Sequence, residues 1–496
     1  MSSILEPAFA PHSFQPTPAA VPVTVAPGDG IGPEITEAVL RILQAAGAAI
    51  APEFVAVGEQ VYRAGNTSGI PAEAWASIDR TGVLLKGPIT TPQGGGYKSL
   101  NVTMRKTLGL YANVRPCRSW KPVVSSRHPD MDVVIIRENE EDLYAGIEHR
   151  QTEDVAQCLK LITRKGSERI IRYAFEYART QGRQRVTCMV KDNIMKITDG
   201  LFHQVFEAVA AEYPEIETNV QIIDFGMANF VHRPESYDVI VLPNLYGDIL
   251  SDVAAQMTGS VGMGGSINIG NGGALFEAIH GSAPDLPRNV ANPSGLLLAA
   301  VEMLRHIGQH PVAARVMNAW LVTLEDGIHT ADIASAQTVK RVGTREFSEA
   351  VIERLGRVPE SFTGAEASAP AEPMKLPHLN EKSPEAANKV LVGVDVFVDW
   401  KQGTPDQLAA ALQAAAPANG PKLVMITNRG VKVWPQGNPK TLCTDHWRCR
   451  FQAETVSHTQ IVALLGAVAS AGLDFIKTEH LYTFDGQAGF SLGQGQ

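Results

Sequence analysis

The chain has 496 residues, a hydrophobic content of 44%, a charged content of 19% and a net charge of −9. This length exceeds one ordinary core and predicts two or three soluble domains, and no apolar run approaches the roughly 20 residues that a bilayer span needs. The acidic balance argues against non-specific nucleic-acid binding. Residues 1–20 contain no Lys or Arg, so we expect a disordered tail rather than a targeting signal. Five scattered cysteines without a C-x-x-C pair favour a reducing cytoplasm and no zinc site.

Strands and helices alternate through the first two thirds of the chain. A strand over 21–26 ends in the Gly-rich turn 27–33, and a helix follows over 34–46. Further strands are predicted over 83–86, 131–137, 185–190, 220–223 and 237–242, and helices over 162–180, 200–213, 248–257 and 294–307. This alternation predicts an α/β core over 21–356.

The composition changes at about residue 357. Residues 357–388 are rich in Pro, Ala, Glu and Ser with little apolar periodicity, which is typical of a linker. A second module over 389–496 has strands predicted over 390–398, 422–427, 431–434, 447–452 and 475–482, and helices over 405–416 and 458–471. The order β-α-β-β-(β)-α-β predicts a small α+β domain of the ferredoxin-like kind, without a catalytic constellation of its own.

A socket for a small polyanion is predicted after Gly94-Gly95-Gly96, where three glycines allow a close backbone approach. Ser99 is a candidate N-cap that would turn the positive end of a helix toward an anion. Asn101 and Arg105 are four residues apart and share one helical face. Arginines are common on protein surfaces, so a single arginine does not identify a binding site. Several guanidinium groups in one pocket, however, suit a ligand with carboxylates. The set is Ser99, Asn101, Arg105, Arg115 and Arg137.

A divalent-metal site is predicted from three carboxylates. Asp248 and Asp252 are four residues apart at the predicted start of a helix, so both lie on one face. Two close carboxylates repel each other unless a cation lies between them, and few hard oxygen ligands suit Mg²⁺ or Mn²⁺. Asp224, at the predicted end of the preceding strand, could add a third ligand. The alternative is an ordinary solvated helix face.

Two further features suit proton transfer and nucleotide binding. Tyr144 and Lys191 are acid–base candidates near predicted strand ends, although each residue type is more often structural. The turn 28–32 is not the G-x-G-x-x-G dinucleotide fingerprint. The glycines at 270–273 lead into 276–286, a loop that could bind an adenosine moiety; taken alone, this signal is weak.

Together these motifs resemble, over residues 23–355, the isocitrate dehydrogenases of the β-decarboxylating dehydrogenase family. The resemblance implies a non-Rossmann fold with large and small α/β domains that close over substrate, followed here by the α+β C-terminal domain found in a minority of members. It implies a homodimer with a shared site, in which Lys191 and Asp224 come from the partner subunit. The implied metal ligands are Asp224, Asp248 and Asp252. The implied substrate residues are Ser99, Asn101, Arg105, Arg115, Arg137, Tyr144, Lys191 and Asn193, and the implied cofactor residues are Thr90, Glu277, His280, Gly281, Ser282, Ala283, Pro284, Asp285, Leu286 and Asn292.

The implied reaction is the tricarboxylic acid cycle step from isocitrate to 2-oxoglutarate and CO₂, with Mg²⁺ or Mn²⁺. Lys191 would assist removal of the C2 hydroxyl proton, and Tyr144 would protonate C3 after decarboxylation. Members that use NADP usually carry Lys-Tyr after the adenosine loop, where this chain has Asp285-Leu286. Because Asp285 would repel a 2′-phosphate, we predict NAD. The alternative is that Asp285 faces solvent and another loop decides.

Other readings stay open within the same resemblance. Relatives act on 3-isopropylmalate, homoisocitrate or tartrate, but the polar Ser99 and Asn101 favour the extra carboxylate of isocitrate. A non-catalytic regulatory subunit is disfavoured because Tyr144, Lys191 and the three aspartates are all present. The C-terminal domain is expected to support subunit association or stability, with regulation or separate binding as alternatives.

Overall fold

The computed structural model describes residues 20–91, 99–368, 374 and 386–493. Two compact units are present: unit 1 comprises 1–144 and 161–379, and unit 2 comprises 145–160 and 380–496. The predicted tail up to residue 19, the three glycines at 94–96 and most of the linker after residue 368 lie outside the described residues. None of the helices in the described ranges has the length and apolar character of a membrane span.

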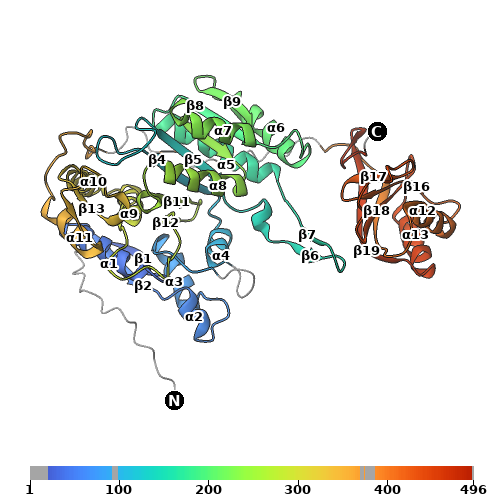
Figure 1. Cartoon of the computed structure of the whole chain (residues 1–496), viewed down its shortest axis with the longest axis horizontal. Helices are drawn as coiled ribbons and strands as arrows, with labels where there is room; N and C mark the ends of the chain where they lie inside the picture. Colours follow the sequence, from blue (N-terminus) through green and yellow to red (C-terminus); the bar gives the residue numbers. More distant parts are fainter. Residues whose placement is uncertain (1–19, 92–98, 369–373, 375–385, 494–496) are drawn as a thin grey trace, which may run out of the picture. The chain divides into compact units, whose positions relative to one another are not determined.

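Unit 1 is built on one ten-stranded sheet with the order β2-β1-β3-β12-β11-β4-β5-β10-β8-β9 (Figure 1). Strands β2-β1-β3-β12 and β5-β10-β8-β9 are parallel, whereas β12-β11-β4-β5 are antiparallel. This order differs from the Rossmann arrangement. The strands are β1 (Val21–Ala26), β2 (Ile50–Phe54), β3 (Val83–Lys86), β4 (Ala112–Arg118), β5 (Asp132–Glu138), β8 (Arg185–Val190), β9 (Glu217–Ile222), β10 (Val239–Leu242), β11 (Gly265–Ile269) and β12 (Ala274–Ala278).

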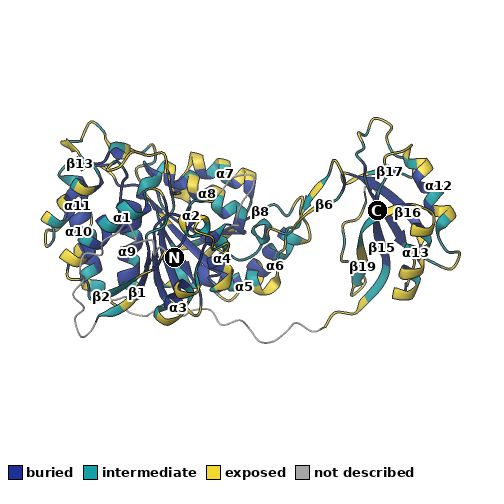
Figure 2. Ribbon diagram, turned by 90° about the horizontal axis from the view of Figure 1, so that it is seen from below, coloured by how far each residue is buried: buried dark blue, intermediate teal, exposed yellow. Residues whose placement is uncertain are grey.

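Helices cover both faces of this sheet, which is why its parallel strands read as continuous apolar runs. In Figure 2 the central strands of unit 1 are buried, and the exposed residues gather on the outer sides of the helices; the edge strands β2 and β9 are more exposed. Contacts group α1, α9, α10 and α11 together, α5 with α6, and α7 with α8. The helices are α1 (Gly32–Ala45), α2 (Glu59–Arg63), α3 (Ala72–Thr81), α4 (Leu100–Thr107), α5 (Arg164–Thr180), α6 (Thr198–Ala210), α7 (Ile223–His232), α8 (Asn244–Met257), α9 (Ser294–His306), α10 (His310–Glu325) and α11 (Thr344–Glu353).

The structure corrects the predicted positions of the three aspartates. Helix α8 begins at Asn244 rather than Asp248, so the two aspartates lie in its second and third turns. The Gly-containing segment before Asp248 resembles a turn in sequence but is helical, and Gly247 packs so closely on Arg137 that a Cβ would lie 2.5 Å from its Cγ. Asp224 lies in the first turn of α7 and not at the end of β9.

The carboxy-terminal part of unit 2 is an antiparallel sheet with the order β17-β16-β18-β15-β19-β20. Capping boxes at Thr404 and Ser457 start its two helices. The predicted α+β class is confirmed. The elements are β15 (Lys389–Asp399), α12 (Pro405–Ala415), β16 (Lys422–Asn428), β17 (Val431–Trp434), β18 (His446–Gln452), α13 (His458–Ser470), β19 (Asp474–Phe484) and β20 (Gln487–Ala488).

Unit 2 also contains a hairpin that the sequence did not predict, β6 (Glu148–Arg150) with β7 (Ala156–Cys158). All but one of the six residues in these strands are exposed, so the hairpin has no core of its own. It is held to the sheet of unit 2 by polar contacts instead. Thr152 Oγ1 donates to Asp445 Oδ1 at 2.6 Å, and Lys477 Nζ donates to Gln157 Oε1 at 3.1 Å.

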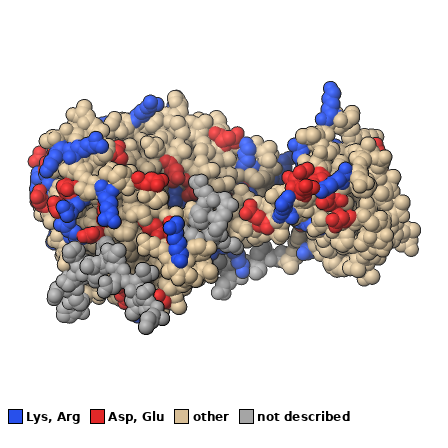
Figure 3. Space-filling view, turned by 60° about the horizontal axis from the view of Figure 1, so that its bottom comes forward, with Lys and Arg blue, Asp and Glu red and all other residues tan. Residues whose placement is uncertain are grey.

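Basic and acidic side chains are interspersed on the face of each unit seen in Figure 3. The arginines predicted to bind a polyanion are instead largely removed from solvent, with 1% of Arg137, 4% of Arg115 and 8% of Arg105 exposed. Their charge is therefore concentrated inside the fold and is not part of a basic surface.

Candidate active site

The candidate catalytic residues follow the carboxyl ends of four adjacent parallel strands. Arg137 is near the end of β5, α8 follows β10, Lys191 follows β8, and Asp224 follows β9. Parallel strands place their carboxyl ends at one edge of a sheet, where ligands of open α/β folds bind. The topology thus brings together segments that are up to about a hundred residues apart in sequence.

Three arginines surround the carboxylate of Asp248. Arg137 Nη1 donates to Asp248 Oδ1, and Arg115 Nη1 lies 3.4 Å from the same oxygen. Burial lowers the pKa of Arg137, and the positive charges of Arg115 and Arg105 lower it further. Asp248 and Glu277 neutralise part of this positive charge, and the remaining guanidinium N–H groups suit a ligand with several carboxylates.

Several buried polar atoms of this cluster are without partners among the described residues. They are Asn101 Oδ1, Arg105 Nε and Arg115 Nε. Because buried polar groups are normally hydrogen-bonded, these atoms are suited to meet a polar ligand. Ser99 occupies the N-cap of α4 as predicted, and its side chain makes no capping hydrogen bond.

Tyr144 lies in a 3₁₀ turn over Leu143–Ala145, and its hydroxyl donates to Asp248 Oδ2. The Arg137 guanidinium is 4.8 Å from the centre of the tyrosine ring. Burial raises the pKa of Tyr144, although the charge of Arg137 opposes this effect. The phenol is therefore kept protonated. A protonated phenol in this position can act as a general acid.

Asp248 and Asp252 flank the guanidinium of Arg115, whose Nη1 is 3.4 Å and 3.5 Å from their Oδ1 atoms. Burial opposes ionisation of Asp248, but Arg137 and Arg115 outweigh it and lower its pKa. Burial and the charge of Asp248 raise the pKa of Asp252 despite Arg115. A divalent cation at these two oxygens would relieve that repulsion, so the pair fits Mg²⁺ or Mn²⁺.

Lys191 and Asp224 form a separate pair, with Lys191 Nζ donating to Asp224 Oδ1 at 2.7 Å. Asn193 is exposed on the same loop as Lys191. In the described part of one chain, no three His, Cys, Asp or Glu residues are arranged to hold a metal. The predicted metal set of Asp224, Asp248 and Asp252 is therefore not assembled within a single chain.

The predicted cofactor residues converge at the carboxyl end of β3. Thr90 Oγ1 and Ser282 Oγ are 2.7 Å apart, and the Ile31 N–H donates to Ser282 O at 2.9 Å. Gly30 has a φ of +57°, and a Cβ there would lie 2.1 Å from Ser282 O, so only glycine allows this approach. The N-terminal Gly-rich turn thus supports the predicted adenosine loop.

The rest of the predicted adenosine loop is more open. Burial lowers the pKa of His280, whose Nδ1 lies 3.0 Å from Gly281 O. Ala283 has a positive φ of 38°, which is unusual for a residue other than glycine and fixes the turn before Asp285. The exposed residues are Gly281, Ala283, Pro284, Asp285 and Leu286, while Asn292 is buried and donates to Asp332 Oδ2 at 3.0 Å.

Glu277 lies on β12 next to the substrate residues, away from the open part of the loop. It forms buried ion pairs with Lys86 Nζ at 2.8 Å and Arg105 Nη2 at 3.2 Å. Burial opposes its ionisation, but Lys86 and Arg105 hold the pKa of Glu277 well below its usual value. Sequence reasoning missed Lys86, although a lysine ending an otherwise apolar strand is a detectable signal. It also missed Asn244, which accepts from Arg137 Nε at 2.9 Å.

Glu138, beside Arg137 on β5, makes the stability of the fold depend on pH. Burial raises its pKa to about 8, against hydrogen bonds from the N–H groups of Glu140 and Glu141. Between the ordinary value of 4.5 and about 8, the folded chain retains a proton that the unfolded chain has released. Its contribution to the free energy of unfolding is complete below the lower value. Between pH 4.5 and about 8 this contribution falls by about 1.4 kcal/mol per pH unit, and above about pH 8 it is lost.

We therefore expect Glu138→Gln, which cannot ionise, to flatten this decline in unfolding measurements from about pH 5 to about pH 9. The exposed Glu349→Gln provides the control and should leave the slope unchanged. A wild-type slope in the Glu138 variant would show that Glu138 ionises normally in the folded state.

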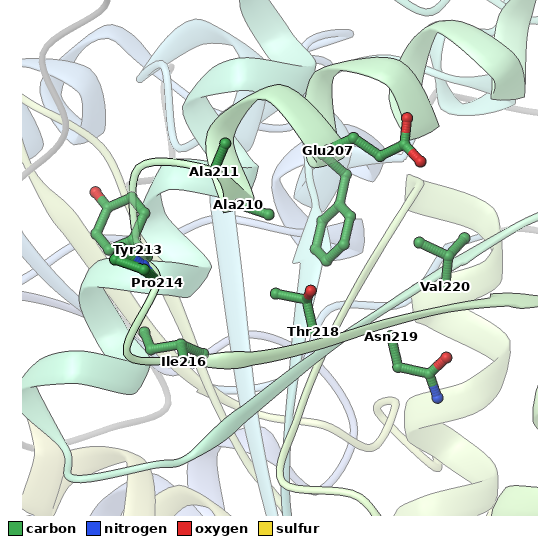
Figure 4. Close-up of a pocket in the computed structure, with 10 residues that line it drawn as sticks. Glu207, Ala210, Ala211, Tyr213, Pro214, Ile216, Thr218, Asn219 and Val220 are labelled. Carbon is green, nitrogen blue, oxygen red and sulfur yellow. The ribbon is translucent and has the colours of Figure 1, made fainter.

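One open hollow lies away from this site, between α6 and the edge strand β9 (Figure 4). Its volume is about 460 Å³, and its lining includes Glu207, Tyr213 and Asn219. None of the predicted site residues lines it. The candidate site is therefore defined by its buried charges and not by this cavity.

Comparison with known proteins identifies the family. A model of isocitrate/isopropylmalate dehydrogenase matches residues 22–351, and one of the bacterial isocitrate dehydrogenase C-terminal domain matches residues 389–496. Isocitrate dehydrogenase [NADP] of Rickettsia felis is 51% identical over 480 residues, covering 96% of this chain and 99% of that protein. The mitochondrial isocitrate dehydrogenase [NAD] catalytic subunit 5 of Arabidopsis thaliana is 44% identical, covering 69% of this chain and 91% of that protein.

The solved structures agree with the sequence comparisons. A crystal structure of a protein from Thermus thermophilus is 44% identical, with a TM-score of 0.89, and covers 96% of each chain. The name of the Rickettsia protein does not support the NAD prediction. The chain belongs to the isocitrate/isopropylmalate dehydrogenase family and carries the C-terminal domain of bacterial isocitrate dehydrogenases.

Proposed function

We propose that the protein oxidatively decarboxylates isocitrate to 2-oxoglutarate, with NAD as the hydride acceptor and Mg²⁺ or Mn²⁺ as the metal. The observation that carries the proposal is the buried group of Arg105, Arg115 and Arg137 around Asp248 and Tyr144. The carboxylates of a tricarboxylate can accept hydrogen bonds from Arg105 Nε and Arg115 Nε, which are buried without partners among the described residues. An apolar isopropyl group would instead leave buried polar atoms of the cluster without partners.

The side chains divide the reaction between them. The arginines bind and orient the carboxylates, and Lys191 assists removal of the proton from the C2 hydroxyl. Tyr144, kept protonated by burial, returns a proton to C3 after CO₂ has left. Asp248 and Asp252 would hold the metal, which when bound supplies Lewis-acid stabilisation of negative charge on the substrate oxygens.

The separation of the two acidic groups supports a homodimer. The Lys191–Asp224 pair is not assembled with Asp248 and Asp252 in the described part of one chain. Apolar side chains next to that pair face solvent, including Phe225 with 62% and Ile194 with 70% exposed. A second copy that covers them would bring its Lys191 to the site of the first, so each active site would be shared.

The adenosine loop supports NAD over NADP. Asp285 is exposed next to Leu286, and an aspartate there repels a 2′-phosphate but can accept a hydrogen bond from a ribose hydroxyl. Relatives named for each cofactor occur, so family membership does not decide the choice. The sequence of this loop is the feature that favours NAD.

Initial velocities with isocitrate and Mn²⁺ test the proposal, with NAD and NADP compared. We expect the wild type to prefer NAD, and Asp285→Lys/Leu286→Tyr to change the ratio of kcat/KM values by at least about tenfold toward NADP. The two changes replace a like-charge repulsion with an attraction. Isocitrate turnover with a wild-type preference for NADP would reject the cofactor proposal alone, whereas no turnover with either cofactor would reject the activity.

A further inference from the structure

A buried carboxylate closes the loop that carries Lys191. Asp199 is the second residue of α6, is fully buried, and accepts a hydrogen bond from the Lys191 N–H at 2.7 Å. At the other end of the same residue, the Lys191 carbonyl accepts from the N–H groups of Ile194 and Met195 at 3.1 Å and 2.9 Å. The Asp199 N–H donates in turn to the Met195 carbonyl at 3.0 Å. The backbone at Lys191 is thus fixed on both sides.

The same carboxylate also contacts the helix that bears the metal-ligand candidates. Tyr246 lies in the first turn of α8, and its hydroxyl donates to Asp199 Oδ2 at 3.1 Å. One oxygen atom therefore joins the Lys191 backbone to α8, which carries Asp248 and Asp252.

We infer that Asp199 is a positioning residue for Lys191, with Tyr246 holding the carboxylate in place. The inference rests on the proposed function, in which Lys191 assists removal of the substrate hydroxyl proton. The lysine side chain is long and flexible, so its reach depends on where its backbone is held. An acidic residue in a first turn also stabilises a helix, and the experiment must separate that role from positioning.

Three variants test the inference. Tyr246→Phe removes one hydroxyl and keeps the packing of the ring, whereas Asp199→Leu removes the acceptor itself. Asp199→Asn keeps an acceptor oxygen and should restore most of the activity that the leucine variant loses. We expect kcat for isocitrate oxidation to fall up to about 100-fold in Asp199→Leu, the effect of misplacing a catalytic group by roughly an ångström, and less in Tyr246→Phe. The KM for isocitrate should change little because the arginine cluster is untouched.

The decisive measurement separates oxidation from the steps that follow. Oxalosuccinate, the oxidised intermediate, needs no removal of a hydroxyl proton before it loses CO₂. We therefore expect Tyr246→Phe and Asp199→Leu to decarboxylate added oxalosuccinate at close to the wild-type rate while isocitrate oxidation falls. Equal losses in both assays would show general damage to the fold and overturn the inference. If Asp199→Leu does not fold, the result for Tyr246→Phe decides.

Two further variants make the outcomes distinguishable. Tyr213→Phe is the matched control, because its hydroxyl also donates to a carboxylate, that of Glu176 at 2.8 Å, and both assays should keep wild-type rates. Lys191→Met tests the proposed function itself. Wild-type oxidation by Lys191→Met would reject the role given to Lys191. An inactive Lys191→Met beside wild-type oxidation by Tyr246→Phe and Asp199→Leu would reject only the positioning role of Asp199.

Discussion

Replacing Arg137 with methionine should reduce kcat/KM for isocitrate roughly 1000-fold and abolish the stabilisation of the protein by isocitrate. The guanidinium is buried among two other arginines and bonds to Asp248 and Asn244. In the absence of substrate, relief of repulsion from Arg105 and Arg115 offsets only part of the stability lost, because Asp248 and Asn244 lose a buried donor. Substrate carboxylates lose a buried donor and have no such compensation.

Thermal unfolding with and without isocitrate measures this difference. Isocitrate should raise the wild-type melting temperature by mass action and should not raise that of Arg137→Met. Arg183→Met is the matched control, because Arg183 pairs with Asp132 and Asp238 next to the amino ends of the same strands. It should lose stability while isocitrate still raises its melting temperature. Stabilisation of Arg137→Met by isocitrate equal to that of wild type would remove Arg137 from the substrate site.

A mixture of two inactive variants should regain activity if the site is shared. Lys191→Met and Asp252→Asn should each lose at least about 100-fold in kcat as homodimers. In a hybrid, one site receives the intact Lys191 of one chain and the intact Asp252 of the other. If the two chains are expressed equally and pair at random, half of the dimers are hybrids. Each hybrid has one working site and one site with both defects. We therefore expect about a quarter of wild-type activity.

The control pair places both changes in the same half of the site. Lys191→Met with Asp224→Asn leaves every site of a hybrid with one defect, so co-expression should restore nothing. Purified hybrids carrying two different affinity tags make the comparison independent of expression level. If Lys191→Met with Asp252→Asn shows no more activity than its parents, each site is formed within one chain and the shared-site proposal fails.

Local sequence supplied the fold class and the candidate site residues. The alternation of apolar strands with amphipathic helices predicted the α/β unit, because buried parallel strands and covered helices leave distinct periodicities. The arginines, the tyrosine and the paired aspartates were selected for the charges and hydrogen bonds that their side chains can make. Local signals were misleading at the start of α8. The segment that ends at Gly247 resembles a turn in sequence, but it is helical and packs on Arg137.

By itself, the sequence determined which residue types are available and where the strongly periodic strands and helices lie, since periodicity depends on neighbours within a few positions. It did not predict β11, β12 or α7. The tertiary structure alone decided which of them meet. It placed Arg115 between Asp248 and Asp252, Glu277 between Lys86 and Arg105, and Asp199 against Lys191 and Tyr246. Burial, which sets the pKa of Tyr144 and Asp252, likewise arises from packing between distant segments. Such contacts leave no periodic trace in one sequence, because their spacing along the chain is set by strand order.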